Sequence, residues 1–277
     1  MGTLHVVATP IGNLEDVSLR ALRVLAEVDV VFAEDTRRTR KLLTRHGIEA
    51  RPLSLHAHNE QSRIARALEA LEGAGQVALV SDAGTPLVSD PGERLVAAAI
   101  AAGHRVEAVP GASAVLAALA VAGLSPAPFT FLGFLPRRAG ERRRLLASYR
   151  SRPETLVLFE SPKRIGKTLA ELGEALGDRK ACVARELTKL HEEARRGRLS
   201  ELADHYTRET LGEITLVVEG AVEGPAVLAE TEVDIEIRAR IAAGERPKQI
   251  AASLAGPSGW AKRDLYARVL ALRAEDA

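Results

Sequence analysis

The sequence predicts an α/β protein made of two α/β domains and a small C-terminal helical module. The chain has 277 residues, enough for about two domains at roughly 150 residues each. Short β-branched runs alternate with helical patterns, which is typical of βα units that build a largely parallel sheet. Beyond Gly220 this alternation stops and the pattern becomes helical. We therefore expect domains at residues 1–124 and 125–222, and a helical extension at residues 223–277.

Four strands are expected in the first domain, each a short apolar run that ends in a polar or glycine-containing turn. They are residues 4–8, 28–33, 77–80 and 106–109. Asp16 and Asn59 are suited to cap the first and third helices, and Gly47 to end the second. Asp90 and Pro91 form an N-cap and N1 pair for a helix that runs to residue 102. A helix of small residues then begins near Ser113.

The second domain is expected to follow a linker at residues 125–128. Its strands are expected at residues 129–135, 155–159, 181–185 and 214–218, with helices after Pro136, after Ser161 and near Leu199. In the extension, residues 246–255 and 261–272 resemble two short helices around a tight turn, a helix-turn-helix-like module or a packing element. Leu254, Trp260 and Leu265 are its expected core.

Composition narrows the class of protein. Hydrophobic residues make up 46% and charged residues 27%, the usual range for a globular chain, so wholesale disorder is excluded. No stretch reaches the roughly 18 consecutive apolar residues of a membrane span, and the first residues form a strand without a basic leader. The single cysteine, Cys182, excludes an internal disulfide. We expect a soluble, cytoplasmic protein with no membrane partner.

Turns at the ends of the expected strands are the strongest signal of a binding site. They comprise residues 9–13, 34–38, 81–86 and 110–113. Ligands of open α/β sheets bind at the carboxyl ends of the strands, and small residues let the backbone approach a ligand. In a parallel sheet these turns meet at one edge. The most informative is SDAGTP at residues 81–86.

Three motifs partly resemble those for dinucleotide binding, P-loop phosphate binding and metal binding, but each lacks a residue that the function requires. The first turn, TPIGN, lacks the G-x-G-x-x-G fingerprint of dinucleotide-binding folds. The segment SPKRIGKT has Ser161 where a phosphate-binding P-loop needs glycine, so Gly166 to Thr168 are expected in a helix. His56 and His58 have no third ligand at a credible spacing, so no metal site is predicted.

Positive charge is clustered although the whole chain is almost neutral. The 38 lysines and arginines face 37 acidic residues, yet residues 137–152 hold seven arginines against Glu141 alone. Further basic groups lie at residues 37–45 and 195–198. Such clusters suit a phosphate backbone. Aromatic residues are only 3%, so shape and phosphate contacts would dominate over base stacking.

Nine sequence blocks together resemble the tetrapyrrole-methylase superfamily of S-adenosylmethionine-dependent enzymes. They are VATPIGNLEDVSLRAL, AEDTRRTRKLL, SLHAHNE, SDAGTPLVSDPG, VPGASA, FLGFLPR, FESPKR, ARELTKLHEE and GEITLVVEG, between Leu4 and Gly220. The AEDTR, HAHNE and FESPKR blocks are similar to the ribosomal branch, which 2'-O-methylates a cytidine ribose in the decoding region of 16S rRNA. The resemblance implies a homodimer of two-domain protomers that holds S-adenosylmethionine in the cleft between the domains. The implied partner is 16S rRNA within the small ribosomal subunit.

The resemblance and the strand ends together define the expected site. Cofactor contacts are expected at Pro10, Asp82, Ala83, Gly84, Thr85, Pro86, Ser113, Ala114, Phe131, Leu132, Glu213, Ile214 and Thr215. Catalytic candidates are Glu34, Asp35, Arg37, Glu160, Lys163, Arg164, Glu186 and Lys189. Of these, Glu160 or Glu186 would accept a proton or hold the hydroxyl, and the three cations Lys163, Arg164 and Lys189 would hold phosphates or stabilise an alkoxide. RNA contacts are expected at Arg38, Arg137, Arg138, Arg142, Arg143 and Arg144.

Two alternative functions stay open on the sequence. One is methylation of a tetrapyrrole or another small substrate by a different branch of the superfamily, against which the arginine clusters argue. The other is a non-catalytic ribosome assembly factor, against which the intact SDAGTP and GEITLVVEG blocks argue. The sequence also leaves open whether naked RNA or an assembled subunit is the substrate.

Overall fold

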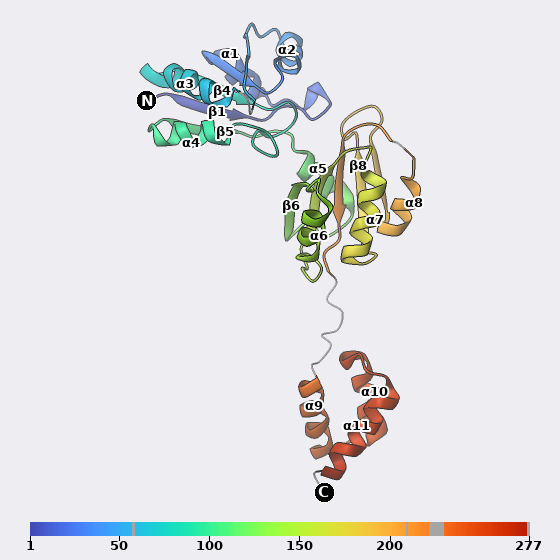
Figure 1. Ribbon diagram of the computed structural model, residues 1–277. Helices are drawn as coiled ribbons and strands as arrows, with labels where there is room; N and C mark the ends of the chain where they lie inside the picture. The colour runs from blue at the N-terminus through green and yellow to red at the C-terminus, as the bar shows by residue number, and fades with distance from the viewer. Residues whose placement is uncertain (57–58, 209, 222–229, 276–277) are drawn as a thin grey trace. The chain divides into compact units, whose positions relative to one another are not determined.

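The computed structural model describes residues 1–56, 59–208, 210–221 and 230–275 (Figure 1). These residues form two compact units, Met1–Ala221 and Val222–Ala277, each with its own apolar core. The predicted α/β class is confirmed: the first unit contains two five-stranded sheets with helices on both faces of each. No helix among the described residues is long and apolar enough to cross a bilayer.

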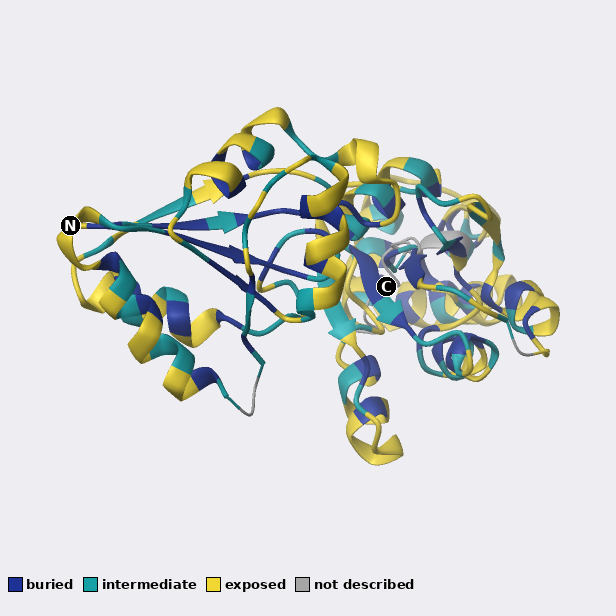
Figure 2. Ribbon diagram, turned by 90° about the horizontal axis from the view of Figure 1, so that it is seen from above, coloured by how far each residue is buried: buried dark blue, intermediate teal, exposed yellow. Residues whose placement is uncertain are grey.

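The first sheet is entirely parallel, as the alternation of strands and helices predicts. Its strands run in the order β3 (Leu53–Ser54), β2 (Val30–Ala33), β4 (Gln76–Val80), β1 (Thr3–Val7) and β5 (Arg105–Val109). Helices α1 (Leu19–Glu27) and α2 (Thr36–Arg45) pack on one face. Helices α3 (Glu60–Leu71) and α4 (Glu93–Ala101) pack on the other. The central strands β2, β4 and β1 are largely buried, the edge strands β3 and β5 are only partly buried, and the helices expose their outer sides (Figure 2).

Two helix starts differ from the prediction. Asp16 lies in a short 3-10 helix, Leu14–Asp16, and the side chain of Ser18 caps α1 by accepting a hydrogen bond from the Ala21 amide. Helix α4 begins at Glu93 with Gly92 as its N-cap, so Asp90 does not cap it. Gly92 has φ +122°, and a Cβ there would lie 2.7 Å from a methyl group of Leu79. This left-handed turn ends the segment before the helix and leaves Asp90 outside it.

The second sheet is mixed, in contrast to the largely parallel arrangement expected from the sequence. Its order is β6 (Phe129–Phe134), β7 (Thr155–Glu160), β10 (Ile214–Val218), β8 (Lys180–Arg185) and β9 (Glu193–Arg198). Only β6 and β7 are parallel, and the other three pairings are antiparallel. Helices α6 (Ala139–Ala147), α7 (Ile165–Leu176) and α8 (Leu199–His205) cover one face. Gly166 and Thr168 lie in α7, as predicted.

Helix α5 (Ala114–Ala122) covers the opposite face of this second sheet. Its apolar residues pack on Val157, Cys182 and Val217. A division of the chain at residue 124 would place α5 with the first sheet, whereas its packing places it on the second. The helix therefore starts at the carboxyl edge of the first sheet and lies within the second half of the unit.

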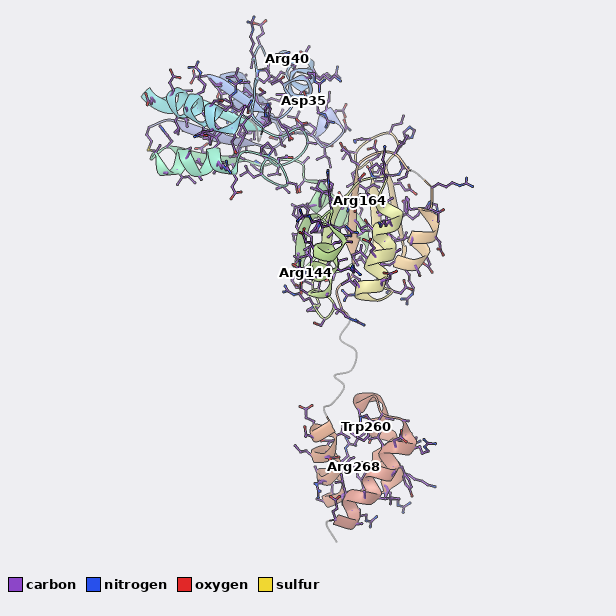
Figure 3. The ribbon with its side chains drawn as sticks, viewed as in Figure 1. Asp35, Arg40, Arg144, Arg164, Trp260 and Arg268 are labelled. Atoms are coloured by element: carbon purple, nitrogen blue, oxygen red, sulfur yellow. The ribbon has the colours of Figure 1, made fainter. Side chains whose placement is uncertain are left out.

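The second unit consists of α9 (Glu230–Ala242), α10 (Pro247–Ser258) and α11 (Lys262–Glu275). Leu254 and Leu265 are buried in its core together with Val233, Ile237 and Val269, and Trp260 packs partly buried against them. The ion pair of Arg268 with Asp234 joins α11 to α9. Figure 3 shows Arg268 and Trp260 in this unit. The core predicted for this region is confirmed.

Candidate functional site

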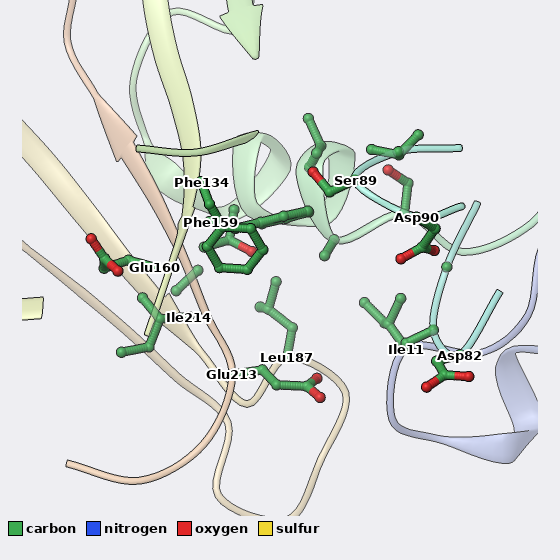
Figure 4. A pocket seen from close by; sticks show the side chains of 18 of the residues that line it. Ile11, Asp82, Ser89, Asp90, Phe134, Phe159, Glu160, Leu187, Glu213 and Ile214 are labelled. Atoms are coloured by element: carbon green, nitrogen blue, oxygen red, sulfur yellow. The ribbon is translucent and has the colours of Figure 1, made fainter. Parts of the chain in front are cut away.

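A cavity of about 450 Å³ lies at the carboxyl edge of the first sheet, between it and the second half of the unit. On one side it is lined by the turns that follow β1, β2, β4 and β5. On the other side it is lined by the ends of β6 and β7 and the start of β10 (Figure 4). The four predicted turns therefore meet at one edge. The volume is in the range of small-molecule sites.

The turn at residues 81–86 is held in place by hydrogen bonds from its neighbours. Thr9 and Gly84 exchange two backbone hydrogen bonds of 2.8 and 3.0 Å. The hydroxyl of Ser81 donates to the Gly84 carbonyl at 2.9 Å, and Oδ1 of Asp82 accepts from the Asp35 amide at 2.7 Å. These bonds tie the turns after β1, β2 and β4 together. The backbone at this edge is therefore preorganised.

Three carboxylates, those of Glu34, Asp82 and Asp90, gather on this side of the cavity. Burial, followed by the negative charges of Glu34 and Asp82, raises the pKa of Asp90 to about 6, although a hydrogen bond from Ser81 opposes the rise. Burial and the charge of Asp82 also raise the pKa of Glu34. Asp90 was absent from the predicted site because its Asp-Pro sequence suggested a helix cap. A cluster of acids at this edge favours a ligand that carries positive charge.

The opposite side of the cavity is apolar and aromatic. Phe134 and Phe159 line it with ring centroids 5.6 Å apart, and Leu187 and Ile214 add aliphatic surface (Figure 4). The predicted Phe131 lies behind Phe159, with its ring edge against it at 5.0 Å, and Leu132 packs toward the core. A cavity with acids on one side and aromatic rings on the other suits a ligand that is both cationic and aromatic.

Most of the predicted cofactor residues line this cavity. They are Asp82, Ala83, Gly84, Thr85, Ser113, Ala114, Glu213, Ile214 and Thr215. Pro10 instead lines a smaller neighbouring cavity of about 300 Å³, and Pro86 is buried. Lining residues that the prediction missed include Ile11, Val88, Ser89, Phe134 and Leu187. These are mostly apolar, and the signal that could have found them is their position next to the quoted turns.

Glu160, a predicted catalytic residue, is buried at the end of β7 with both carboxylate oxygens occupied. Oε1 accepts from the Ser161 amide at 2.7 Å, and Oε2 accepts from the Thr168 hydroxyl at 2.5 Å. Nη2 of Arg164 lies 3.4 Å from Oε2. Glu160 is thus engaged in holding α7 and Arg164. Lys163, on the same loop, is exposed and does not line the cavity.

Glu186 and Lys189 form a network with Glu213 below the cavity. Nζ of Lys189 donates to Glu186 at 2.8 Å and to Glu213 at 3.0 Å, and the Glu213 amide donates to Glu186 at 2.8 Å. The hydrogen bond from Lys189, followed by that from the Glu213 amide, lowers the pKa of Glu186. Burial lowers the pKa of Lys189, but its hydrogen bonds to the carboxylates of Glu186 and Glu213 outweigh this effect and the pKa is raised overall. This network ties the loop after β8 to the start of β10.

Asp35 and Arg37 pair with each other at the start of α2 and lie outside the cavity wall. Nε and Nη2 of Arg37 donate to the two Asp35 oxygens at 3.0 and 2.8 Å, and these bonds hold the pKa of Asp35 well below its usual range. Asp35 also caps α2.

Of the histidine pair His56 and His58, His58 lies outside the described residues, as does the intervening Ala57.

The predicted RNA-binding arginines occupy different environments. Arg38 lines the cavity, 3.8 Å from Asp82 and 4.0 Å from Glu213. Four others are exposed on and before α6, namely Arg137, Arg138, Arg143 and Arg144. Arg142 is a correction: it is buried and its guanidinium donates to both oxygens of Glu171, so it anchors α6 to α7 and does not face solvent. Arg196 on β9 likewise donates to carbonyl groups at the end of α5.

Comparison with known families and sequences gives consistent matches. The profile of the family described as Tetrapyrrole (Corrin/Porphyrin) Methylases matches residues 3–203. A protein of Mesorhizobium japonicum named Ribosomal RNA small subunit methyltransferase I is 48% identical over 275 residues, 98% of this chain and 92% of its own. A protein of the same name from Thermotoga maritima is 48% identical over 221 residues, 79% of this chain and 99% of its own.

Solved structures share the fold at lower identity. A diphthine synthase has a TM-score of 0.64 at 19% identity, covering 79% of this chain and 90% of that one. A uroporphyrin-III C-methyltransferase from Thermus thermophilus, complexed with S-adenyl homocysteine, has a TM-score of 0.55 at 21% identity, covering 78% of this chain and 97% of that one. These likenesses extend over the two-sheet architecture and concern the fold alone.

Proposed function

The chain belongs to the family of tetrapyrrole (corrin/porphyrin) methylases, and from this membership we propose that it methylates the ribose 2'-oxygen of a cytidine in the decoding region of 16S rRNA. S-adenosylmethionine is the methyl donor in this proposal. The main support for rRNA as the substrate is the 48% identity, over nearly the whole chain, to a protein named for small-subunit rRNA methylation. The exposed arginines on and before α6 support a polyanionic substrate.

The cavity fits this cofactor. Its acids Glu34 and Asp82 would stabilise the positive ammonium and sulfonium groups, and Phe134 and Phe159 would contact the adenine. The preorganised turn at residues 81–86 offers backbone groups to the methionine end. Bound S-adenosylmethionine supplies a methyl group that is already activated by its sulfonium. The protein then has to position the hydroxyl, exclude water and accept a proton.

Asp90 is the residue best suited to accept the proton of the ribose hydroxyl. No cation forms an ion pair with it among the described residues, and its pKa of about 6 keeps it ionised near neutral pH while leaving it basic. Glu160 and Glu186, the bases suggested by the sequence, are less suitable. Both oxygens of Glu160 already accept hydrogen bonds, and Lys189 lowers the pKa of Glu186.

Methyl transfer to RNA is tested with tritiated S-adenosylmethionine. Small subunits that lack 2'-O-methylation and naked 16S rRNA are compared as acceptors, and the label is mapped by nuclease digestion. We expect label on a single decoding-region ribose, with the assembled subunit as the better acceptor and a homodimer as the active species. Label on a base, or transfer to a corrinoid precursor and none to RNA, would contradict the proposal.

A further inference from the structure

A second cavity, of about 830 Å³, adjoins the first at the end of β7. The two share Phe134, Glu160 and Ser161 as a common wall. From this wall the second cavity extends along the first turns of α7 and the segment that leads into α6. In Figure 4, Glu160 lies at the side of the first cavity farthest from Asp82 and Asp90. The second cavity is therefore next to the methyl-donor site but away from its acidic side.

The charges that line the two cavities are opposite in sign. The first is lined by five carboxylates and a single guanidinium, that of Arg38. The second is lined by Arg137, Arg142, Arg164 and Lys167 against only two carboxylates, Glu160 and Glu171. A cationic donor and an anionic acceptor would each find complementary charge on its own side of the shared wall.

Among the described residues, two of the four cations in the second cavity have no carboxylate of their own, and a third is paired but partly exposed. Arg142 is saturated by Glu171. Lys167 is 74% exposed and its Nζ lies 4.0 Å from that same, already paired carboxylate. Arg137 is exposed and forms no ion pair among the described residues. Nη2 of Arg164 lies 3.4 Å from Oε2 of Glu160, and the side chain is one-third exposed.

The smaller neighbouring cavity, on the other side of the first, is a weaker candidate for an anion. It is lined by Arg38, Lys41 and Lys189. Lys189 is held between Glu186 and Glu213, and Arg38 between Asp82 and Glu213. Two of its three cations are therefore already neutralised. The observations favour the cavity at α7.

We propose that the second cavity is the acceptor subsite, in which Arg137, Arg164 and Lys167 bind backbone phosphates of the RNA next to the methylated nucleotide, while the ribose of that nucleotide itself reaches past the shared wall into the first cavity, toward Asp90. This inference rests on the proposed function and names where its substrate binds. Glu160 acts as a positioning residue, since it fixes Arg164 and the start of α7 from the shared wall. Contacts between these three cations and backbone phosphates do not read the base sequence, so they would set the affinity and register of the RNA rather than sequence specificity.

The test uses the full chain with Arg137→Glu and Lys167→Glu combined, and a decoding-region 16S rRNA fragment as the probe. Both side chains are exposed, so we expect folding to be unaffected. Fluorescence anisotropy should show at least a tenfold weaker RNA Kd and a slope of log K against log salt that is smaller by about 1 for each lost phosphate contact. The Kd for S-adenosylmethionine, measured by calorimetry, should stay within twofold.

Lys180→Glu is the matched control, because Lys180 is an exposed lysine at the start of β8 that lines neither cavity. If the double variant binds RNA no more weakly than this control, the subsite is wrong even when wild-type protein methylates rRNA. If wild-type protein binds RNA through these residues but transfers no methyl group, the RNA subsite is supported and the proposed reaction is contradicted. If wild-type protein binds neither the fragment nor assembled small subunits, both are wrong.

Discussion

Asp90 combines half-burial with two neighbouring carboxylates, and both effects favour its neutral form. As a general base it must be ionised, so the rate of methyl transfer should rise with pH and level off above about pH 6. Asp90→Asn should lower kcat by about 100-fold or more and abolish this rise. The measurement is a pH profile of kcat with rRNA as acceptor. A variant with wild-type kcat and an unchanged profile would exclude Asp90 as the base.

The same pKa shift has a signature in stability. Because the pKa of Asp90 is raised in the folded chain, its contribution to the free energy of unfolding is largest below pH ~4 and is lost as the pH rises through about 6. Burial is the largest cause of the raised pKa, followed by the charges of Glu34 and Asp82, while the hydrogen bond from Ser81 opposes it. Asp90→Asn should flatten that part of the stability curve, which gives a readout that does not depend on activity.

Single residues are also where the sequence was least informative. Asp90 and Arg142 both have local patterns that suggest another role, a helix cap and a solvated basic face. Their environments in the structure depend on tertiary partners, Glu34 and Asp82 for Asp90 and Glu171 for Arg142. By contrast, Asp82 to Thr85 line the cavity at the sheet edge where the sequence places their turn, because a strand-end turn of small residues has a fixed place in a parallel sheet.

Helix α7 contains two glycines in very different surroundings. A Cβ on Gly166 would lie 2.2 Å from the Tyr206 carbonyl oxygen, a backbone atom at the end of α8. Gly166→Ala should therefore push the helices apart and lower the free energy of unfolding by about 1–3 kcal/mol. At Gly173 the nearest atom is 3.8 Å away, so Gly173→Ala should raise stability by up to about 1 kcal/mol. Urea unfolding of both variants checks this, and equal effects would refute the packing argument.

Among the elements, four strands of the first sheet were predictable, whereas the two-residue β3 and the polar β9 were not. Strands β1, β2 and β4 are mostly apolar and buried, which is the usual pattern of a parallel sheet, and the edge strand β5 keeps a shorter apolar signal at Val106, Ala108 and Val109. Strand β9 has the sequence EARRGR and pairs with β8 at the edge of its sheet. Its backbone hydrogen bonds, rather than apolar side chains, place it there. A polar edge strand of this kind leaves no periodic signal.

At the scale of the whole molecule, the two units have separate cores. The clusters of the first unit contain no residue beyond Val218, and the cluster of the second begins at Val233. A chain that ends at Ala221 should fold, melt in one cooperative transition and bind S-adenosylmethionine as the full chain does. The length of the Thermotoga maritima relative agrees with this expectation. Calorimetry of the shortened chain is the measurement, and a broad, non-cooperative transition would contradict it.

The wall shared by the two cavities also has a thermodynamic consequence. Phe134, Glu160 and Ser161 border both cavities. A ligand that binds in one cavity and restricts the motion of this wall therefore lowers the entropy cost of binding a second ligand in the other cavity. Any resulting change in affinity must be reciprocal: if the methyl donor tightens RNA binding by some factor, RNA tightens donor binding by the same factor. Random-order kinetics with heterotropic cooperativity would then be the natural behaviour of this enzyme, and its size would depend on how firmly Glu160 holds the first turn of α7.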